Sequence, residues 1–171
     1  MRKLIYFLTL ITLVLTIYLH ADPYEYVMPV KGANRSSYSQ RSFWAYPWGT
    51  SGHHKGVDIF AKKGTPVLSA TRGIVVFNGV LSKGGNAVLV FGPWFRQHYY
   101  AHLDNSEVGL FDFLSPGERI GTVGTTGNAK GKPPHLHYAI GRLIPKLEGE
   151  MEWSKRFYQD PTPELNRAVR D

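Results

Sequence analysis

Short apolar segments separated by turn residues constrain the fold of this 171-residue chain more than any other feature. Turns that contain glycine and proline, such as KGTP at 63–66 and SPG at 115–117, recur at spacings of roughly 8 to 12 residues. The segments between them are rich in β-branched and aromatic residues, which favour strands. The predicted strands are residues 66–70, 73–77, 86–91, 98–102, 119–123 and 135–140. This pattern predicts an all-β domain of mainly antiparallel strands, with a short helix only at residues 163–169.

The N-terminus departs from this pattern and predicts an export signal. Arg2 and Lys3 give a positive start, and the next 16 residues, 4–19, are mostly apolar. That run is short for a membrane-spanning helix, which needs about 20 residues. We therefore expect residues 1–21 to be a signal peptide that is cleaved after Ala21. Because Leu19 is large for the position three residues before that bond, an uncleaved N-terminal membrane anchor is the alternative.

The rest of the chain is long enough for one domain with a hydrophobic core, but not for two. We expect a short N-terminal segment at residues 22–41, the folded domain at 42–163 and a C-terminal tail at 164–171. There is no cysteine, so disulfides and thiolate metal ligands are excluded.

The charge of the chain favours anionic surroundings but does not by itself choose among them. Loss of Arg2 and Lys3 with the signal peptide lowers the formal net charge from +7 to +5. A basic domain favours polyanionic surroundings such as a cell wall, a membrane surface or nucleic acid. From the N-terminal segment we expect the domain to be exported, in the periplasm, at the cell envelope or secreted. No basic cluster or nucleic-acid-binding motif is present, and nothing in the sequence indicates an oligomeric state.

Two histidines of the segment PPHLHYAI, residues 133–140, are separated by a single residue. In a strand, residues two apart project from the same face, so His135 and His137 would point together while Leu136 faces the other way. An isolated pair of this kind is most often two exposed side chains on a sheet. Its interpretation therefore depends on partners elsewhere in the chain.

The segment HHKGVDIF, residues 53–60, supplies such partners. His54 and Asp58 are four residues apart, which spans about 13 Å in a straight strand. That distance barely permits one shared metal, whose ligands lie ~2 Å away, but Gly56 allows the chain to bend. We therefore expect His54 in a loop and Asp58 at the start of a strand. With one or two histidines of the other segment they provide three nitrogen or oxygen ligands and an open fourth position, which is typical of catalytic zinc.

Zinc in such a site activates a water molecule, and hydrolysis then needs a group that handles protons. No HExxH motif supplies the glutamate of helical zinc proteases. His102, in the segment YYAHLDN, would act together with whichever of His135 and His137 is not a ligand, because imidazole titrates near neutral pH. His53 and His98 lack such a role and are expected at the surface or beside the site.

Three segments, in this order, resemble the LytM/lysostaphin-type zinc metallopeptidases. They are HHKGVDIFAKKGTPVLSATRGIVVFNG, YYAHLDN and SPGERIGTVGTTGNAKGKPPHLHYAI, and the resemblance extends over residues 30–163. It implies one Zn²⁺ per chain and a largely antiparallel β fold with the zinc in a groove walled by loops. The site residues that it implies are the zinc ligands His54, Asp58 and His137 and the catalytic pair His102 and His135.

The resemblance also implies a substrate, namely the peptide stems or cross-links of bacterial peptidoglycan, cut by an endopeptidase. Two other functions are considered. One is a non-catalytic relative that binds peptidoglycan and activates another hydrolase, and the other is a secreted zinc protease that acts on proteins. Non-catalytic relatives typically lack some of the five site positions, all of which are present here. Four aromatic residues, Phe43, Trp44, Tyr46 and Trp48, are expected either to line the groove or to pack in the core.

Overall fold

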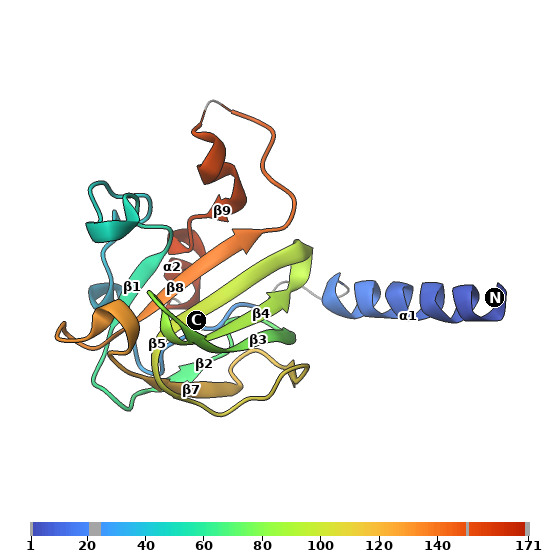
Figure 1. Cartoon of the computed structure of the whole chain (residues 1–171), viewed down its shortest axis with the longest axis horizontal. Coiled ribbons are helices and arrows are strands. Elements are labelled where there is room, and N and C mark those ends of the chain that lie inside the picture. Colours follow the sequence, from blue (N-terminus) through green and yellow to red (C-terminus); the bar gives the residue numbers. More distant parts are fainter. Residues whose placement is uncertain (1, 21–24, 150, 170–171) are drawn as a thin grey trace.

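The structure is a computed structural model and describes residues 2–20, 25–149 and 151–169. In these residues the strands form one antiparallel sheet of nine strands, which confirms the predicted all-β fold (Figure 1). The strands are β1 (Val57–Phe60), β2 (Pro66–Leu68), β3 (Gly73–Leu81), β4 (Gly85–Gly92), β5 (Arg96–Ser106), β6 (Phe113–Leu114), β7 (Arg119–Val123), β8 (His135–Arg142) and β9 (Tyr158–Gln159).

The sheet brings segments that are distant in sequence side by side. Its main order is β1-β8-β5-β4-β3-β6, while β7 pairs with β2 and β5, and β9 pairs with β8. Each predicted strand corresponds to an observed one, although β3 and β5 extend well beyond the predicted ends. β6 and β9 have two residues each, which is too short for a pattern of alternation to predict them.

The helices lie at the ends of the chain and in the connections. They are the α-helices α1 (Arg2–His20) and α2 (Thr162–Ala168) and the 3₁₀ helices η1 (Arg35–Ser37), η2 (Gly49–Ser51), η3 (Pro93–Phe95), η4 (Gly127–Ala129) and η5 (Trp153–Phe157). α2 coincides with the helix predicted near the C-terminus. α1 projects away from the sheet (Figure 1), and large apolar side chains such as Leu4 and Phe7 are exposed on it.

Among the described residues, no helix combines the length and the apolar character that a membrane span requires. The expected cleavage point after Ala21 lies outside the described residues. α1 and Phe113 also enclose a pocket that is lined by Leu10, Ile11, Val14 and Leu15. This pocket has no ionisable side chain and lies apart from the histidines.

Strand alternation separates the core from the face that carries the histidines. In β8, the side chains of Leu136, Tyr138 and Ile140 are fully buried, and in β1 those of Val57 and Ile59 are as well. Complete burial of one such aliphatic side chain contributes roughly 1.5–3 kcal/mol. The residues between them must therefore project from the opposite face of the sheet.

His98 belongs to the core, which corrects the expectation of a surface position. It is completely buried in β5, with its Nδ1 atom 2.6 Å from the Tyr138 hydroxyl oxygen. Burial lowers the pKa of His98 to about 3, and the nearby charge of Arg96 acts in the same direction. At neutral pH this ring is uncharged and serves as a core side chain.

Candidate active site

The register of three neighbouring strands places the central residues of the site. In the antiparallel pair of β1 and β8, Asp58 lies directly opposite His137 and Phe60 lies opposite His135. On the other side of β8, Ala101 of β5 lies opposite His137. Because directly opposed residues project from the same face of a sheet, Asp58 and the two histidines of β8 face the same space.

His54 reaches this space from the loop before β1, as expected. Its backbone N–H donates to the carbonyl of Ala45 over 3.0 Å, and its own carbonyl accepts from Trp44 N–H over 2.7 Å. Its ring Nδ1–H donates to the carbonyl oxygen of Ser42 over 2.9 Å. One face of the ring stacks on Trp48, with centroids 4.1 Å apart. These contacts fix the direction in which Nε2 points.

Gly56 is required by a close approach between strands and not by a special backbone angle. A Cβ atom at this position would overlap the carbonyl oxygen of Tyr138 and would lie 3.0 Å from Cε1 of His137. The chain between His54 and Asp58 can therefore pass directly against β8 only because residue 56 has no side chain.

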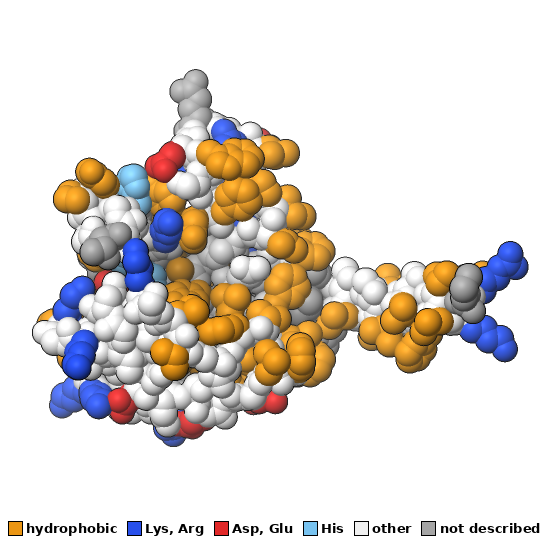
Figure 2. Space-filling model, in the orientation of Figure 1, with side chains coloured by type: hydrophobic (Ala, Val, Ile, Leu, Met, Phe, Trp, Pro, Cys, Tyr) orange, Lys and Arg blue, Asp and Glu red, His pale blue; other side chains and the backbone are white. Residues whose placement is uncertain are grey.

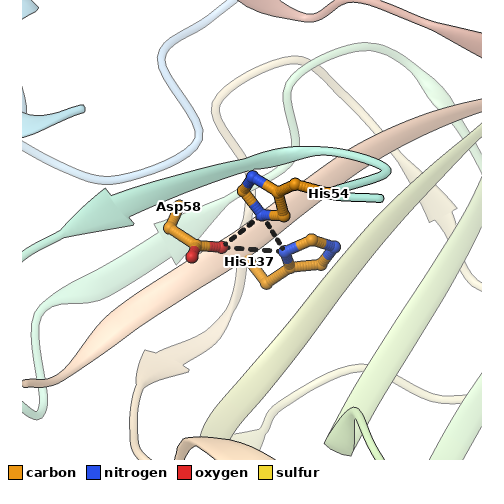
Figure 3. Close-up of side chains that lie close together, drawn as sticks. All are labelled: His54, Asp58 and His137. Atoms are coloured by element: carbon orange, nitrogen blue, oxygen red, sulfur yellow. Dashed lines mark hydrogen bonds and ion pairs between the residues drawn. The ribbon is translucent and has the colours of Figure 1, made fainter. Parts of the chain in front are cut away.

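Three ligand atoms converge where these elements meet (Figure 3). Asp58 Oδ1 is 3.0 Å from His54 Nε2 and 2.8 Å from His137 Nδ1, and the two nitrogens are 3.2 Å apart. Ligand atoms that are each ~2 Å from a tetrahedral zinc ion lie about 3.3 Å from one another. The observed spacings are close to that value, and the three residues form the group of described side chains that could hold a metal ion.

The protonation of the cluster also fits a cation. Because Nδ1 of His54 carries the hydrogen that Ser42 accepts, the neutral ring presents a lone pair at Nε2. This lone pair faces a carboxylate oxygen and a second imidazole nitrogen. A neutral His137 ring can place one hydrogen on Nδ1 and donate it to Asp58. Even then, the lone pairs of the Asp58 oxygen and of His54 Nε2 outnumber the hydrogens between the three atoms. A divalent cation would be a favourable partner for all three atoms.

Asp58 is ionised in this setting. Burial by itself would raise its pKa, but the hydrogen bonds that the rings of His137 and His54 donate when protonated, together with the positive charge of those protonated rings, outweigh it. The pKa of Asp58 consequently lies well below its ordinary value. Asp58 therefore supplies a carboxylate, and not a carboxylic acid, to the cluster.

His102 faces the same cleft because of an irregularity in β5. Asn86 of β4 pairs with Leu103, whereas Val88, two residues on, pairs with Tyr100, so β5 contains an extra residue there. Such a β-bulge re-aims the side chains that follow it. His102 itself has a φ of 65°, in the left-handed region that few non-glycine residues adopt. Its N–H donates to Gly84 O over 2.8 Å, which holds this conformation.

His102 and His135 form a pair next to the three-residue cluster, with ring centroids 5.0 Å apart. Nδ1–H of His102 donates to the carbonyl of Thr126 over 2.9 Å, and Nδ1–H of His135 donates to that of Pro133 over 2.8 Å. Each neutral ring therefore keeps a basic Nε2. Burial lowers the pKa of His102 to about 4, and the neighbouring rings of His137 and His135 act in the same direction.

All five residues line one open cleft of about 900 Å³. Figure 2 shows this side of the molecule, with histidine side chains exposed beside a hollow in the surface. The arrangement of a metal-binding cluster next to a histidine pair in an open cleft is suited to metal-assisted hydrolysis.

Comparison with known proteins identifies the family. The model of peptidase family M23 matches residues 52–148, which is more than half of the chain. The chain belongs to peptidase family M23. The matched region contains all five residues of the site.

Two relatives and one solved structure illustrate the similarity of this M23 chain. It is 37% identical over 157 residues to the L-Ala–D-Glu endopeptidase of Bacillus subtilis, covering 86% of this chain and 45% of that protein. It is 34% identical over 126 residues to lysostaphin of Staphylococcus simulans, covering 72% and 24%. The chain thus spans less than half the length of either relative. The catalytic domain of lysostaphin, an antimicrobial peptidase, superimposes with a TM-score of 0.60 at 31% identity, covering 72% of this chain and 88% of that domain.

Two of the four aromatic residues of this M23 chain, Phe43 and Trp48, lie in the positions expected for them, whereas Trp44 and Tyr46 pack elsewhere. Trp48 lines the cleft and stacks on His54. Phe43 is partly buried against the core. Trp44 and Tyr46 pack on His53, with centroids 5.2 and 5.1 Å from that ring.

Sequence reasoning missed the backbone atoms that orient the histidines. The carbonyls of Ser42, Thr126 and Pro133 each accept from an Nδ1–H of the site. A carbonyl group is present at every residue, so it leaves no signal in a sequence. Tyr99, whose ring meets that of His137 edge-on at 6.1 Å, was also missed, because regular alternation would place it on the opposite face of the strand from His102.

Proposed function

We propose that this M23 peptidase is a zinc-dependent endopeptidase that hydrolyses peptide bonds in the stems or cross-links of bacterial peptidoglycan. The observation that carries the proposal is the convergence of His54, Asp58 and His137 beside a second histidine pair in one open cleft. The names of the relatives, an L-Ala–D-Glu endopeptidase and lysostaphin, support this reaction and this class of substrate.

In this proposal His54, Asp58 and His137 hold one Zn²⁺. Two imidazole nitrogens and a carboxylate oxygen are a usual donor set for catalytic zinc, and the ionised Asp58 suits it. When bound, the ion would polarise the substrate carbonyl and make water more acidic. Ser42 and Trp48 keep the His54 ring in the orientation that this role requires.

His102 and His135 handle protons in the same proposal. With Nδ1–H donated to a backbone carbonyl, each neutral ring can accept a proton at Nε2. A ring that has accepted a proton can donate it to the departing amine or stabilise negative charge on the carbonyl oxygen. Both rings are largely buried, so they keep a fixed orientation in the cleft.

We also propose that the enzyme works outside the cytoplasm. Residues 1–21 would direct export, and residues 42–163 would form the metallopeptidase domain. The basic charge of the chain suits an anionic cell wall. Recovery of the protein from the cell envelope or the medium, with its N-terminus determined by mass spectrometry, tests export and cleavage after Ala21 together.

Digestion of purified peptidoglycan sacculi tests the reaction. The purified full chain, loaded with Zn²⁺, is incubated with sacculi, and the released fragments are identified by mass spectrometry. A parallel digest with His135→Ala is the control, since this variant keeps the three proposed ligands. Fragments with a newly exposed amine and carboxylate, seen only with the intact site, are the expected result.

Three other results would contradict the proposal in different ways. Binding of the zinc-loaded protein to sacculi without release of fragments would favour a non-catalytic activator. Cleavage of denatured protein substrates, but not of sacculi, would favour a secreted protease. Release by His135→Ala at the wild-type rate would remove the histidine pair from the mechanism.

A further inference from the structure

The cleft of the candidate active site is lined by cations. Lys55, Lys83 and Lys132 all line it, together with the histidines. Of the described residues in its lining, Asp58 alone carries a carboxylate, and that group lies in the cluster with His54 and His137. Figure 2 shows Lys and Arg side chains gathered along one side of the hollow, near the exposed histidine.

The three lysines come from three different loops, before β1, between β3 and β4, and before β8. Lys55 lies beside the ring of Tyr158, with its Nζ atom 5.6 Å from the ring centroid. Lys83 belongs to the turn between β3 and β4, and its carbonyl accepts from Asn128 N–H over 2.9 Å. Lys132 lies next to Pro133, whose carbonyl orients His135. Three separate segments of the chain therefore each contribute a cation to the lining of the cleft.

Among the described residues, no acidic side chain other than that of Asp58 lines the cleft. Glu152, which directly precedes η5, is 3.9 Å from His53 and is also attracted by the charge of Lys55, but it is half exposed and does not line the cleft. A Zn²⁺ ion held by Asp58 and the two histidines would add further positive charge. Charged groups in a binding cleft mainly determine which partner is accepted and how fast it arrives.

We propose that this cleft selects acidic peptides, whose carboxylates are bound by Lys55, Lys83 and Lys132. This inference rests on the proposed function and narrows it to a substrate class. A peptide of glycine residues offers no side-chain carboxylate, so it would gain nothing from these three lysines. Stem peptides that contain acidic residues would be preferred.

A comparison of charged and neutral forms of the same peptides tests the selection. Soluble stem peptides prepared from purified sacculi are used as free acids and after amidation of their carboxyl groups with a carbodiimide and ammonium chloride. N-acetyl-pentaglycine amide is the uncharged reference. With the zinc-loaded full chain, kcat/KM for the free acids is expected to exceed that for the amidated peptides about tenfold, and the preference is expected to weaken with added salt.

Lysine variants assign the effect to this cleft. Lys55→Gln, Lys83→Gln and Lys132→Gln are each expected to lower kcat/KM for the free acids about two- to fivefold, because partly exposed ion pairs are weak. The triple variant is expected to cleave acid and amidated peptides equally. Lys31→Gln, an exposed lysine outside the cleft lining, is the matched control and is expected to keep the preference. Zinc content and circular dichroism verify that each variant is folded.

The outcomes separate the inference from the proposed function. Equal cleavage of acid and amidated peptides by the wild type, or a triple variant that keeps the preference, would overturn the inference and leave the peptidase intact. Efficient cleavage of N-acetyl-pentaglycine amide would do the same. Absence of cleavage of sacculi and of every peptide would instead refute the proposed function.

Discussion

Backbone carbonyls determine how three of the four histidines of the site are oriented. Three of the rings donate Nδ1–H to carbonyls, those of Ser42, Thr126 and Pro133, and so present Nε2 to the cleft. His137 is different, because its Nδ1 atom faces Asp58. The roles proposed for the five residues therefore depend on small loop segments as much as on the strands themselves.

His102→Ala tests the division between metal binding and proton handling. The ring of His102 lies beside His135 and outside the cluster of His54, Asp58 and His137, so the variant is expected to bind one Zn²⁺ as the wild type does. Loss of a positioned general acid or base is expected to lower kcat about 10²- to 10⁴-fold. Fragment release from sacculi and zinc content measure the two effects. Near-normal turnover would exclude His102 from the reaction.

Gly56→Ala tests the close approach of the chain to β8. The added methyl group would overlap Tyr138 O and crowd the ring of His137, so the strands must move apart. We expect a loss of about 1–3 kcal/mol in the free energy of unfolding and weaker zinc binding, measured by urea denaturation and zinc titration. Gly109→Ala is the control, since its nearest neighbour would be 3.5 Å away. An equal effect of both substitutions would contradict this explanation.

At the scale of elements, the sheet creates the site from two properties of strands. Alternation sends Leu136 to the core and its two histidine neighbours to the cleft. The second property is the bulge in β5, which lies between Tyr100 and Leu103. There the face to which successive side chains point is shifted by one residue. In a regular strand His98 and His102 would share a face, but His98 is in the core and His102 in the cleft.

These elements show how far the sequence predicts the structure. The shared face of His135 and His137 and the loop position of His54 follow from spacing and turn residues, and the structure agrees. The burial of His98 could not be predicted, because no residue of β5 marks the bulge in advance. Histidine also gives no reliable burial signal, since it is of intermediate hydrophobicity. Strands of two residues are too short to show alternation.

His98 makes the stability of the domain depend on pH. Its pKa is about 3 in the folded chain and about 6.5 in an unfolded chain. Between pH 3 and 6.5 His98 binds a proton only in the unfolded state, which favours unfolding. The stability that comes from keeping this ring neutral is therefore complete above pH 6.5 and is lost as the pH falls towards 3. We expect His98→Gln to reduce the slope of unfolding free energy against pH by about 1.4 kcal/mol per pH unit between pH 6 and 4. Urea denaturation at several pH values measures the free energy of unfolding. Equal slopes of this free energy against pH for the variant and the wild type would contradict the conclusion that His98 is buried and neutral.

At the scale of the whole molecule, the fold and the metal site are largely independent. The core of buried aliphatic and aromatic side chains lies on the opposite face of β1 and β8 from the cluster. Catalytic zinc sits in such a preformed cleft, whereas structural zinc replaces a missing core.

Removal of zinc is therefore expected to stop catalysis without unfolding the protein. A chelator should reduce fragment release from sacculi to background, while the far-ultraviolet circular dichroism of the sheet remains. Addition of Zn²⁺ should restore release. Collapse of the β signal on chelation would show instead that the metal is structural.

The number of zinc ions bound per chain tests the central claim most directly, because the claim assigns different tasks to the two histidines of HLH. Native mass spectrometry is applied to the Zn²⁺-loaded full chain and to His137→Ala and His135→Ala. The account predicts one zinc ion in the wild type and in His135→Ala, and none in His137→Ala. One zinc ion retained by His137→Ala, or its loss from His135→Ala, would contradict it.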